Sequence, residues 1–173
     1  MGLSWSESGY LALSAVNVKK GYIDYDADAH YGNEKLYSKW MKGNELHKGQ
    51  VLFTTEAPMG NVAQIPDDEK YILSQRTIAF EPNSKMLIED FLAIILSTPN
   101  TFNKLLSLSS GGTAKGISQK TLTELKIVIP NNLEEQKRLG IIIKKINKII
   151  TLRQEKIKEL KQLKKYLLQK LFI

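Results

Sequence analysis

The spacing of hydrophobic positions divides the chain into two parts. From about residue 132 onward, seam positions recur at alternating intervals of four and three residues, and eight of the ten are apolar. A mean spacing of 3.5 residues, kept up for over four heptads, is typical of a coiled-coil helix. One such helix cannot bury its own stripe, so the pattern predicts a partner helix. The seam consists of Leu139, Ile143, Ile146, Ile150, Arg153, Ile157, Leu160, Lys164, Leu167 and Leu171.

A capping signal marks the start of this long helix. Asn132 is followed three residues later by Glu135, which is the spacing of a capping box. We therefore predict a helix from residue 132 to the end of the chain. This divides the protein into a domain over residues 1–130 and a helical segment over residues 131–173.

The first 130 residues mix strand-like alternation with helical spacing. Thr98-Pro99 separates a helix ending near Leu96 from a second helix over 101–108, and Ser118 is placed to cap a short helical turn. Residues 26–49 look irregular, with Trp40 and Met41 packed back onto the core. The class we expect is α+β: a mixed-strand domain followed by a long C-terminal coiled-coil helix. The predicted strands cover residues 11–18, 22–25, 50–55, 61–65, 71–73, 77–80 and 125–129.

Positive charge is concentrated on the predicted helix. The net charge is +7, and residues 131–173 hold 12 Lys or Arg against 4 Glu, whereas residues 1–130 hold 13 basic and 14 acidic residues. A basic segment suits a polyanion such as DNA, RNA or an anionic membrane, but it also keeps a coiled coil soluble. No apolar run approaches the roughly 20 residues of a membrane span. With no cysteine and no signal-like start, we expect a cytoplasmic protein that does not enter membranes.

The sequence offers little catalytic chemistry. His30 and His47 are the only histidines, and neither lies in metal-ligand spacing. The chain has no G-x-S-x-G nucleophile elbow, and the glycine-rich segment 111–116 does not match the phosphate-loop template. We therefore expect no catalytic residue, no metal site and no cofactor.

Four polar loops are candidates for contact with nucleic acid. Arginine and glutamine pair bidentately with guanine and adenine, while small residues and lysine allow a close approach to the phosphate backbone. Each residue taken singly also fits a solvated surface position. The candidates are Lys19 and Lys20 at a strand end, Thr55 and Asn61 at a hairpin tip, Gln75 and Arg76 between two strands, and Gly112, Thr113, Lys115 and Ser118 in and after the glycine-rich segment.

Several segments, taken in order, resemble one half of a type I restriction–modification specificity subunit. The most specific is the last, in which a strand-like run ends at Pro130 and Leu133-Glu134-Glu135-Gln136 opens the long helix. The matching blocks are Gly9-Tyr10-Leu11-Ala12-Leu13 with Asn17-Val18 and Gly21, Gln50-Val51-Leu52-Phe53-Thr54 with Gly60-Asn61-Val62, Ser74-Gln75-Arg76, Gly111-Gly112-Thr113 with Ile117-Ser118, and Leu125-Lys126-Ile127-Val128-Ile129-Pro130.

The resemblance implies recognition of double-stranded DNA without catalysis. In that family a target recognition domain reads a few base pairs, a helix spaces it from a second such domain, and separate modification (methyltransferase) and restriction subunits perform the chemistry. A full-length member carries two domains and two helices, whereas this chain carries one of each. The chain is then either a natural half-subunit or a fragment of a longer subunit. We expect it to form a homodimer through antiparallel C-terminal helices and to read an inverted repeat with a non-specific spacer.

The seam also suggests a register for that dimer. With the two-fold axis near Glu155, Leu139 faces Leu171 of the partner subunit, and Arg153 lies near the partner's Glu155. Ile142, Ile149, and Leu163 widen the stripe, which fits either packing on the chain's own domain or docking of modification subunits.

Two other functions fit the same pattern. One is a stand-alone regulator that binds DNA and dimerises through its coiled coil. The other is an adaptor without DNA binding, whose lysine-rich helix meets an acidic partner.

Overall fold

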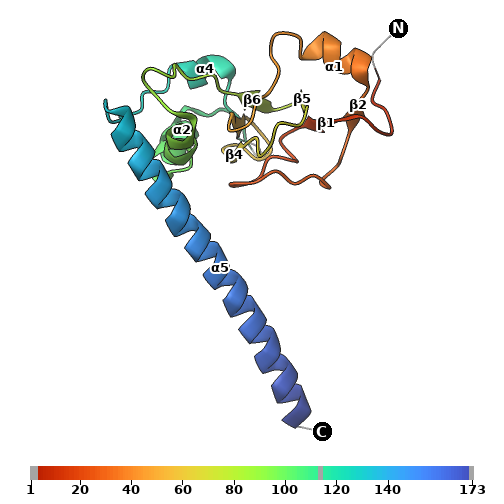
Figure 1. Ribbon diagram of the computed structural model, residues 1–173, viewed down its shortest axis with the longest axis vertical. Coiled ribbons are helices and arrows are strands. Elements are labelled where there is room, and N and C mark those ends of the chain that lie inside the picture. Colours follow the sequence, from red (N-terminus) through yellow and green to blue (C-terminus); the bar gives the residue numbers. More distant parts are fainter. Residues whose placement is uncertain (1–3, 113–114, 172–173) are drawn as a thin grey trace.

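The computed structural model describes residues 4–112 and 115–171. Figure 1 shows a mixed α/β head with one long helix, α5 (Leu133–Leu171), projecting from it. We use "head" for the described residues before α5. The predicted α+β class and the long C-terminal helix are confirmed, whereas Thr113 lies outside the described residues.

The first of two small sheets contains the N-terminal strand. Its order is β2-β1-β5, formed by β1 (Tyr10–Leu13), β2 (Tyr31–Gly32) and β5 (Ile72–Leu73). β1 pairs antiparallel with β2 and parallel with β5. A segment some 60 residues downstream therefore completes the sheet that β1 begins.

The second sheet is an antiparallel set centred on one buried strand. Its order is β4-β3-β6, formed by β3 (Val51–Thr54), β4 (Val62–Gln64) and β6 (Thr77–Ala79). The predicted hairpin over 50–65 is present, with Leu52 opposite Ala63.

Strand β3 lies between two cores. All four of its residues are fully buried. Successive side chains of a strand point to opposite faces. Val51 and Phe53 accordingly pack in the cluster that includes Leu92 and Leu105. Leu52 packs on the other face, in a second cluster with residues of β1. The strand therefore ties the helical half of the head to the first sheet.

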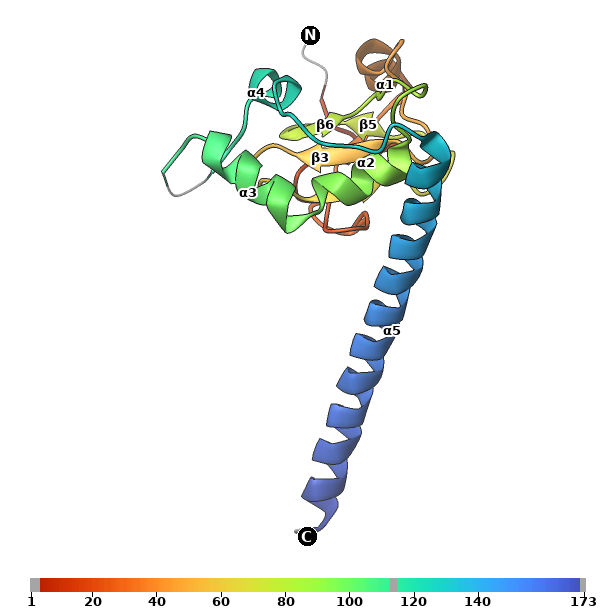
Figure 2. The ribbon, with the colours of Figure 1, turned by 90° about the vertical axis from the view of Figure 1, so that its left-hand side faces the viewer.

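Four helices of the head lie around its two sheets (Figures 1 and 2). α2 (Glu89–Leu96) contacts both β3 and β4. α3 (Pro99–Leu108) and α4 (Gln119–Thr123) begin at the side-chain caps Thr98 and Ser118, so the predicted break at Thr98-Pro99 and the predicted capped turn are confirmed. α1 (Glu34–Trp40) packs in the core cluster of the first sheet.

Three predicted details of the head are wrong. Residues 26–49 are not irregular throughout, because Asn33 caps α1; Met41 is buried as predicted, but Trp40 is 46% exposed. β1 ends at Leu13, and the predicted return strand forms only a single bridge between Val18 and Ile23. The third wrong detail is the strand predicted over residues 125–129.

Residues 125–129 are not a strand. Leu125 and Ile127 pack against the core as alternation predicts, while Val128 is 87% exposed. In the described chain, however, these residues belong to no β-ladder. Apolar alternation reports which side chains face the core, and an extended segment satisfies it without a neighbouring strand.

The beginning of α5 is fixed to the head by buried polar contacts. The Asn132 side chain accepts the Glu134 N–H at 2.8 Å, so the predicted cap is confirmed. Gln136 is fully buried: its oxygen accepts the Ile88 N–H at 3.1 Å, and its nitrogen donates to the carbonyls of Met86 and Pro130, each at 2.8 Å. One glutamine thereby joins α5 to the entry of α2 and to the chain segment before α5.

About two turns further along the helix, an ion pair extends this attachment. Lys144 Nζ lies 2.5 Å from Asp90 Oδ1 on α2, and Gln64 Nε2 donates to the same oxygen at 2.9 Å. Burial favours a raised pKa for Asp90, but these two hydrogen bonds outweigh it and hold the pKa of the carboxyl below its usual value. We call residues 133–144 the root of α5.

Beyond its root, α5 is exposed to solvent along its whole described length. Leu139 and Ile143 are half-buried, whereas every residue from 144 to 171 is exposed, including Ile149 and Leu163. The head therefore does not cover the apolar seam. Among the described residues, no helix combines the length and the apolar character needed to cross a membrane.

Candidate nucleic-acid interface

Three loops that are distant in sequence meet at one edge of the head. Thr55 follows β3, Arg76 lies between β5 and β6, and Ile117 precedes α4. The Thr55 N–H donates to the Arg76 carbonyl at 2.8 Å, and the Ile117 N–H donates to the Thr55 carbonyl at 2.9 Å. Residues 55–57, 74–76, 110–112 and 115–118 thus form one surface, which we call the three-loop edge.

The glycine-rich loop is closed by its own backbone. Ser110 and Gly116 exchange two hydrogen bonds of 3.0 and 2.9 Å, and Gly116 also bridges to Glu56. A shallow cleft of about 310 Å³ runs over this contact and is lined by Thr55, Ser110, Gly111 and Ser118, among others. Backbone and hydroxyl groups of this kind are suited to a phosphate chain.

Strained backbone gathers beside the same edge. Among the described residues, three that are not glycine have positive φ, namely Asp28 (+45°), Ala57 (+50°) and Arg76 (+60°). All three line one recess of about 220 Å³, together with Trp5 and Gln75, among others. Strained residues of this type persist only where the surrounding structure enforces them, and they cluster at functional sites.

Arg76 is exposed but oriented. Its Nε lies 3.3 Å from Glu56 Oε2, and the two side chains are 55% and 42% exposed. The Glu56 stem in turn packs on Gly116, where an added Cβ would lie 3.3 Å from Glu56 Cγ. An exposed ion pair contributes little stability, so its main effect here is on the direction of the guanidinium group.

The candidate residues predicted from sequence fall into two groups. Thr55, Gln75, Arg76, Ser118 and the described part of the glycine-rich loop, including Gly112 and Lys115, belong to the three-loop edge. Ser118 also caps α4, since its hydroxyl accepts the Thr121 N–H at 3.1 Å.

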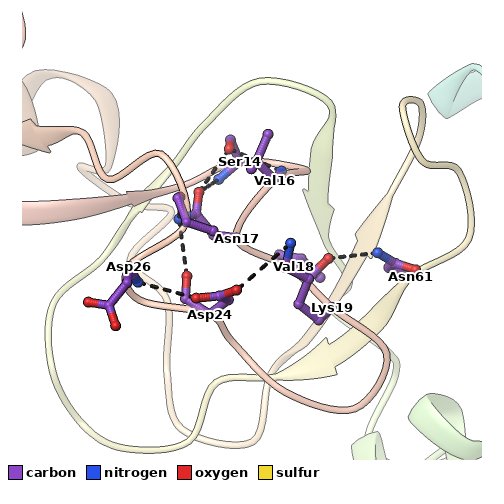
Figure 3. Close-up of polar contacts among 9 residues, drawn as sticks. Ser14, Val16, Asn17, Val18, Lys19, Asp24, Asp26 and Asn61 are labelled. Atoms are coloured by element: carbon purple, nitrogen blue, oxygen red, sulfur yellow. Dashed lines mark hydrogen bonds and ion pairs between the residues drawn. The ribbon is translucent and has the colours of Figure 1, made fainter.

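Lys19, Lys20 and Asn61 lie apart from the three-loop edge. Asn61 is only 7% exposed and donates to the Val18 carbonyl at 2.9 Å, which makes it a structural link between the β3–β4 hairpin and residues 14–27 (Figure 3). Lys19 pairs with Asp24 at 3.9 Å, while Lys20 is exposed beside a pocket of about 440 Å³ whose lining includes Asn147 of α5.

Asn17 organises the loop that carries these lysines. It is fully buried; its oxygen accepts the Ser14 hydroxyl at 2.8 Å, and its nitrogen donates to the carbonyls of Asp24 and Ala27 at 3.2 and 2.6 Å. Figure 3 shows Asn17 and Asn61 at two sides of the same loop.

Sequence reasoning missed several residues of this surface. Glu56 adjoins the predicted Thr55, but an acidic side chain carries no signal for DNA contact. Trp5 stacks on His30 with ring centroids 5.7 Å apart, and both line the recess beside Arg76. Nothing in their spacing relates them to Arg76, because they meet it only through the fold.

We also searched the described residues for side chains that could bind a metal ion. Over the described residues, 4–112 and 115–171, no group of three or more His, Asp or Glu side chains lies close enough to hold an ion. The three-loop edge gathers a guanidinium, amides, hydroxyls and glycine backbone, which are groups able to contact nucleic acid, together with the carboxylate of Glu56.

Comparison with known proteins identifies the family. The chain belongs to the family of type I restriction modification DNA specificity domains, which it matches over residues 6–162. The resemblance predicted from its sequence blocks is thereby confirmed.

One curated relative supports this assignment. The chain is similar to the specificity subunit of the type I restriction enzyme HindI from Haemophilus influenzae, with 28% identity over 101 residues. The match covers 56% of this chain and 22% of that subunit. The chain therefore matches about a fifth of the relative's length.

Proposed function

We propose that the head reads a short DNA sequence as the recognition domain of a type I specificity subunit. The observation that carries this proposal is the three-loop edge, where Thr55, Gln75 and Arg76 join a glycine-rich loop in a chain of the DNA specificity family. Arginine and glutamine supply base-reading groups, while the loop supplies groups for the phosphate backbone.

We further propose that two copies pair through antiparallel α5 helices. The support is the exposed seam: Ile146, Ile150, Ile157, Leu160 and Leu167 are each about half exposed. Exposed apolar stripes of this length mark an interaction surface. The 39 residues of α5 span about 58 Å at 1.5 Å per residue, so antiparallel pairing places one head at each end. The target is then an inverted repeat with a spacer that neither head reads.

The proposed partners follow from the family. The dimer directs methyltransferase (modification) subunits and the restriction subunit to its target in the cytoplasm and performs no chemistry itself. Such subunits bind at the exposed side chains that widen the seam, which are Ile142, Ile149 and Leu163.

A methylation experiment tests the function. The chain is co-expressed with a type I modification subunit, and adenine methylation is mapped across the host genome. We expect methylated adenines within one two-part motif, and none when the chain is omitted. Methylation outside any two-part motif contradicts the proposal. Sequence-selective DNA binding without a methyltransferase partner points instead to a regulator, and no DNA binding at all points to an adaptor.

A crosslinking experiment tests the helix arrangement. The chain has no cysteine, so single Leu139→Cys and Leu171→Cys variants give unambiguous disulfides. Antiparallel pairing predicts that a mixture of the two variants forms a 139–171 crosslink, while neither variant alone crosslinks efficiently. A 139–139 crosslink indicates a parallel pair and contradicts the proposal.

A further inference from the structure

We propose that Arg76 reads a guanine in the DNA target and that Glu56 is the residue that positions it. This inference rests on the proposed function and adds a base and a mechanism of orientation. It starts from the one arginine in the three-loop edge, which combines positive φ with a directional ion pair.

Backbone hydrogen bonds hold Arg76 in an unusual conformation that directs its side chain out of the turn. Its φ is +60°, a conformation that L residues seldom adopt. The Arg76 carbonyl accepts the Thr55 N–H at 2.8 Å, and the neighbouring Gln75 carbonyl accepts the Ala15 N–H at 3.2 Å. The turn is thus tied on one side to the end of β3 and on the other to the segment after β1, which fixes the origin of both exposed side chains.

Glu56 fixes the direction of the guanidinium. It binds Nε at 3.3 Å, and end-on recognition of guanine uses the two terminal nitrogens of the same planar fork. The Glu56 backbone bridges Gly116, and its side-chain stem packs against that glycine. The carboxylate therefore cannot follow the arginine freely; the arginine orients to the carboxylate.

The charge of the pair distinguishes a base from a phosphate. An arginine that only neutralises phosphate needs its full positive charge, and an adjacent carboxylate cancels most of that attraction. A carboxylate on a DNA-facing edge also repels the backbone. The arrangement is useful when directional hydrogen bonds matter more than charge, which is the case for guanine O6 and N7.

The recess beside Arg76 fits this assignment. Trp5, Val16 and Gln75 line it together with Arg76, so the recess offers a base-pair edge both polar groups and apolar surface. Gln75 provides an amide next to the guanidinium, which suits reading of a neighbouring base.

The test measures which position of the target each variant affects. The wild-type motif is first obtained by selecting bound duplexes from a randomised library, and each variant is then selected from the same library. Arg76→Lys keeps the charge but loses the fork. We expect it to bind random duplex within about twofold of wild type and to lose roughly 5- to 150-fold discrimination at one G·C pair, the range for one bidentate contact. Arg76→Gln is expected to shift the preference at that pair toward A·T.

Variants of Glu56 separate positioning from simple charge. Glu56→Ala removes a negative charge, so affinity for random duplex rises, yet discrimination at the Arg76 position falls. Glu56→Gln retains a hydrogen-bond acceptor and keeps most of that discrimination. As a matched control, Lys120→Ala removes an exposed charge from α4 and is expected to weaken all sequences by the same factor.

The outcomes separate this inference from the proposed function. A wild-type chain that selects no motif overturns both. A wild-type motif that lacks a G·C pair, or one that stays unchanged in Arg76→Lys and Arg76→Gln, overturns the inference alone. A uniform gain of affinity in Glu56→Ala, with the motif preserved, rejects the positioning role. Circular dichroism of each variant confirms that it is folded before binding is compared.

Discussion

Replacing Gln136 with leucine tests how the head holds α5. Leucine has a similar size and cannot hydrogen-bond, so the change leaves the Ile88 N–H and the carbonyls of Met86 and Pro130 without this partner. Gln136 is fully buried, whereas Met86 is 62% exposed and its carbonyl is more accessible to water. The loss of stability therefore comes mainly from the Ile88 N–H and the Pro130 carbonyl, which belong to half-buried residues and are left without a hydrogen-bond partner.

The expected change in the free energy of unfolding can be worked out from these two groups. A buried donor or acceptor left unsatisfied costs about 1–3 kcal/mol. For two half-buried groups we expect Gln136→Leu to lower the free energy of unfolding by about 2–4 kcal/mol. With an m-value of about 2 kcal/mol/M, the urea midpoint falls by about 1–2 M.

Urea denaturation at one fixed protein concentration measures this effect, because dimerisation makes stability depend on concentration. Fluorescence of Trp5 and Trp40 follows the head, and circular dichroism at 222 nm follows the helices. Gln162→Leu is the matched control, since it makes the same change at an exposed position of the same helix. We expect the control to stay within about 0.5 kcal/mol of wild type. Equal midpoints for Gln136→Leu and the control would refute the argument.

Three further predictions concern the head and its attachment to α5. Because the pKa of Asp90 is lowered in the folded state, its pairing with Lys144 stabilises the fold at pH values above the unfolded-state pKa of about 4. This stabilisation is lost as the pH falls through the folded-state pKa. The urea midpoint of Asp90→Asn should therefore lie below that of wild type at pH 7 and converge with it in acid. Gly32→Ala should cost about 1–3 kcal/mol, because the new Cβ overlaps side chains of β5 and α1, whereas thermal melts of Gly112→Ala, which meets nothing within 4 Å, should match wild type. Asn17→Ala should cost about 2–4 kcal/mol in urea titrations, since it leaves the carbonyls of the half-buried Asp24 and Ala27 without this donor; a change below about 0.5 kcal/mol would contradict this role.

Local patterns predicted the elements that local physics determines. The seam of α5, the cap at Asn132, the hairpin over 50–65 and the break at Thr98-Pro99 all depend on residues close in sequence. Helix α1 was missed because it is seven residues long and begins in a polar segment, where its cap at Asn33 has few periodic neighbours.

The rest depends on contacts between distant segments. β1 pairs with β5 across roughly 60 residues, and no local pattern specifies that register. The pairing of Arg76 with Glu56 arises in the same way, because two loops must first be brought together by β3 and β6. Sequence therefore identified Arg76 and Gln75 as chemically suitable but gave no reason to include Glu56 or Trp5.

The root of α5 also acts as the pivot of a lever. The exposed part of the helix, residues 144–171, extends about 40 Å at 1.5 Å per residue. Gln136 lies about 52 Å from Leu171 along the helix, so a tilt of about 10° at Gln136 would displace Leu171 by about 9 Å, more than the rise of one helical turn. Buried hydrogen bonds at the pivot limit such tilting far more than a smooth apolar contact would. The accuracy with which the far end of α5 is placed thus depends on the hydrogen bonds of Gln136 and on the Lys144–Asp90 pair at its near end.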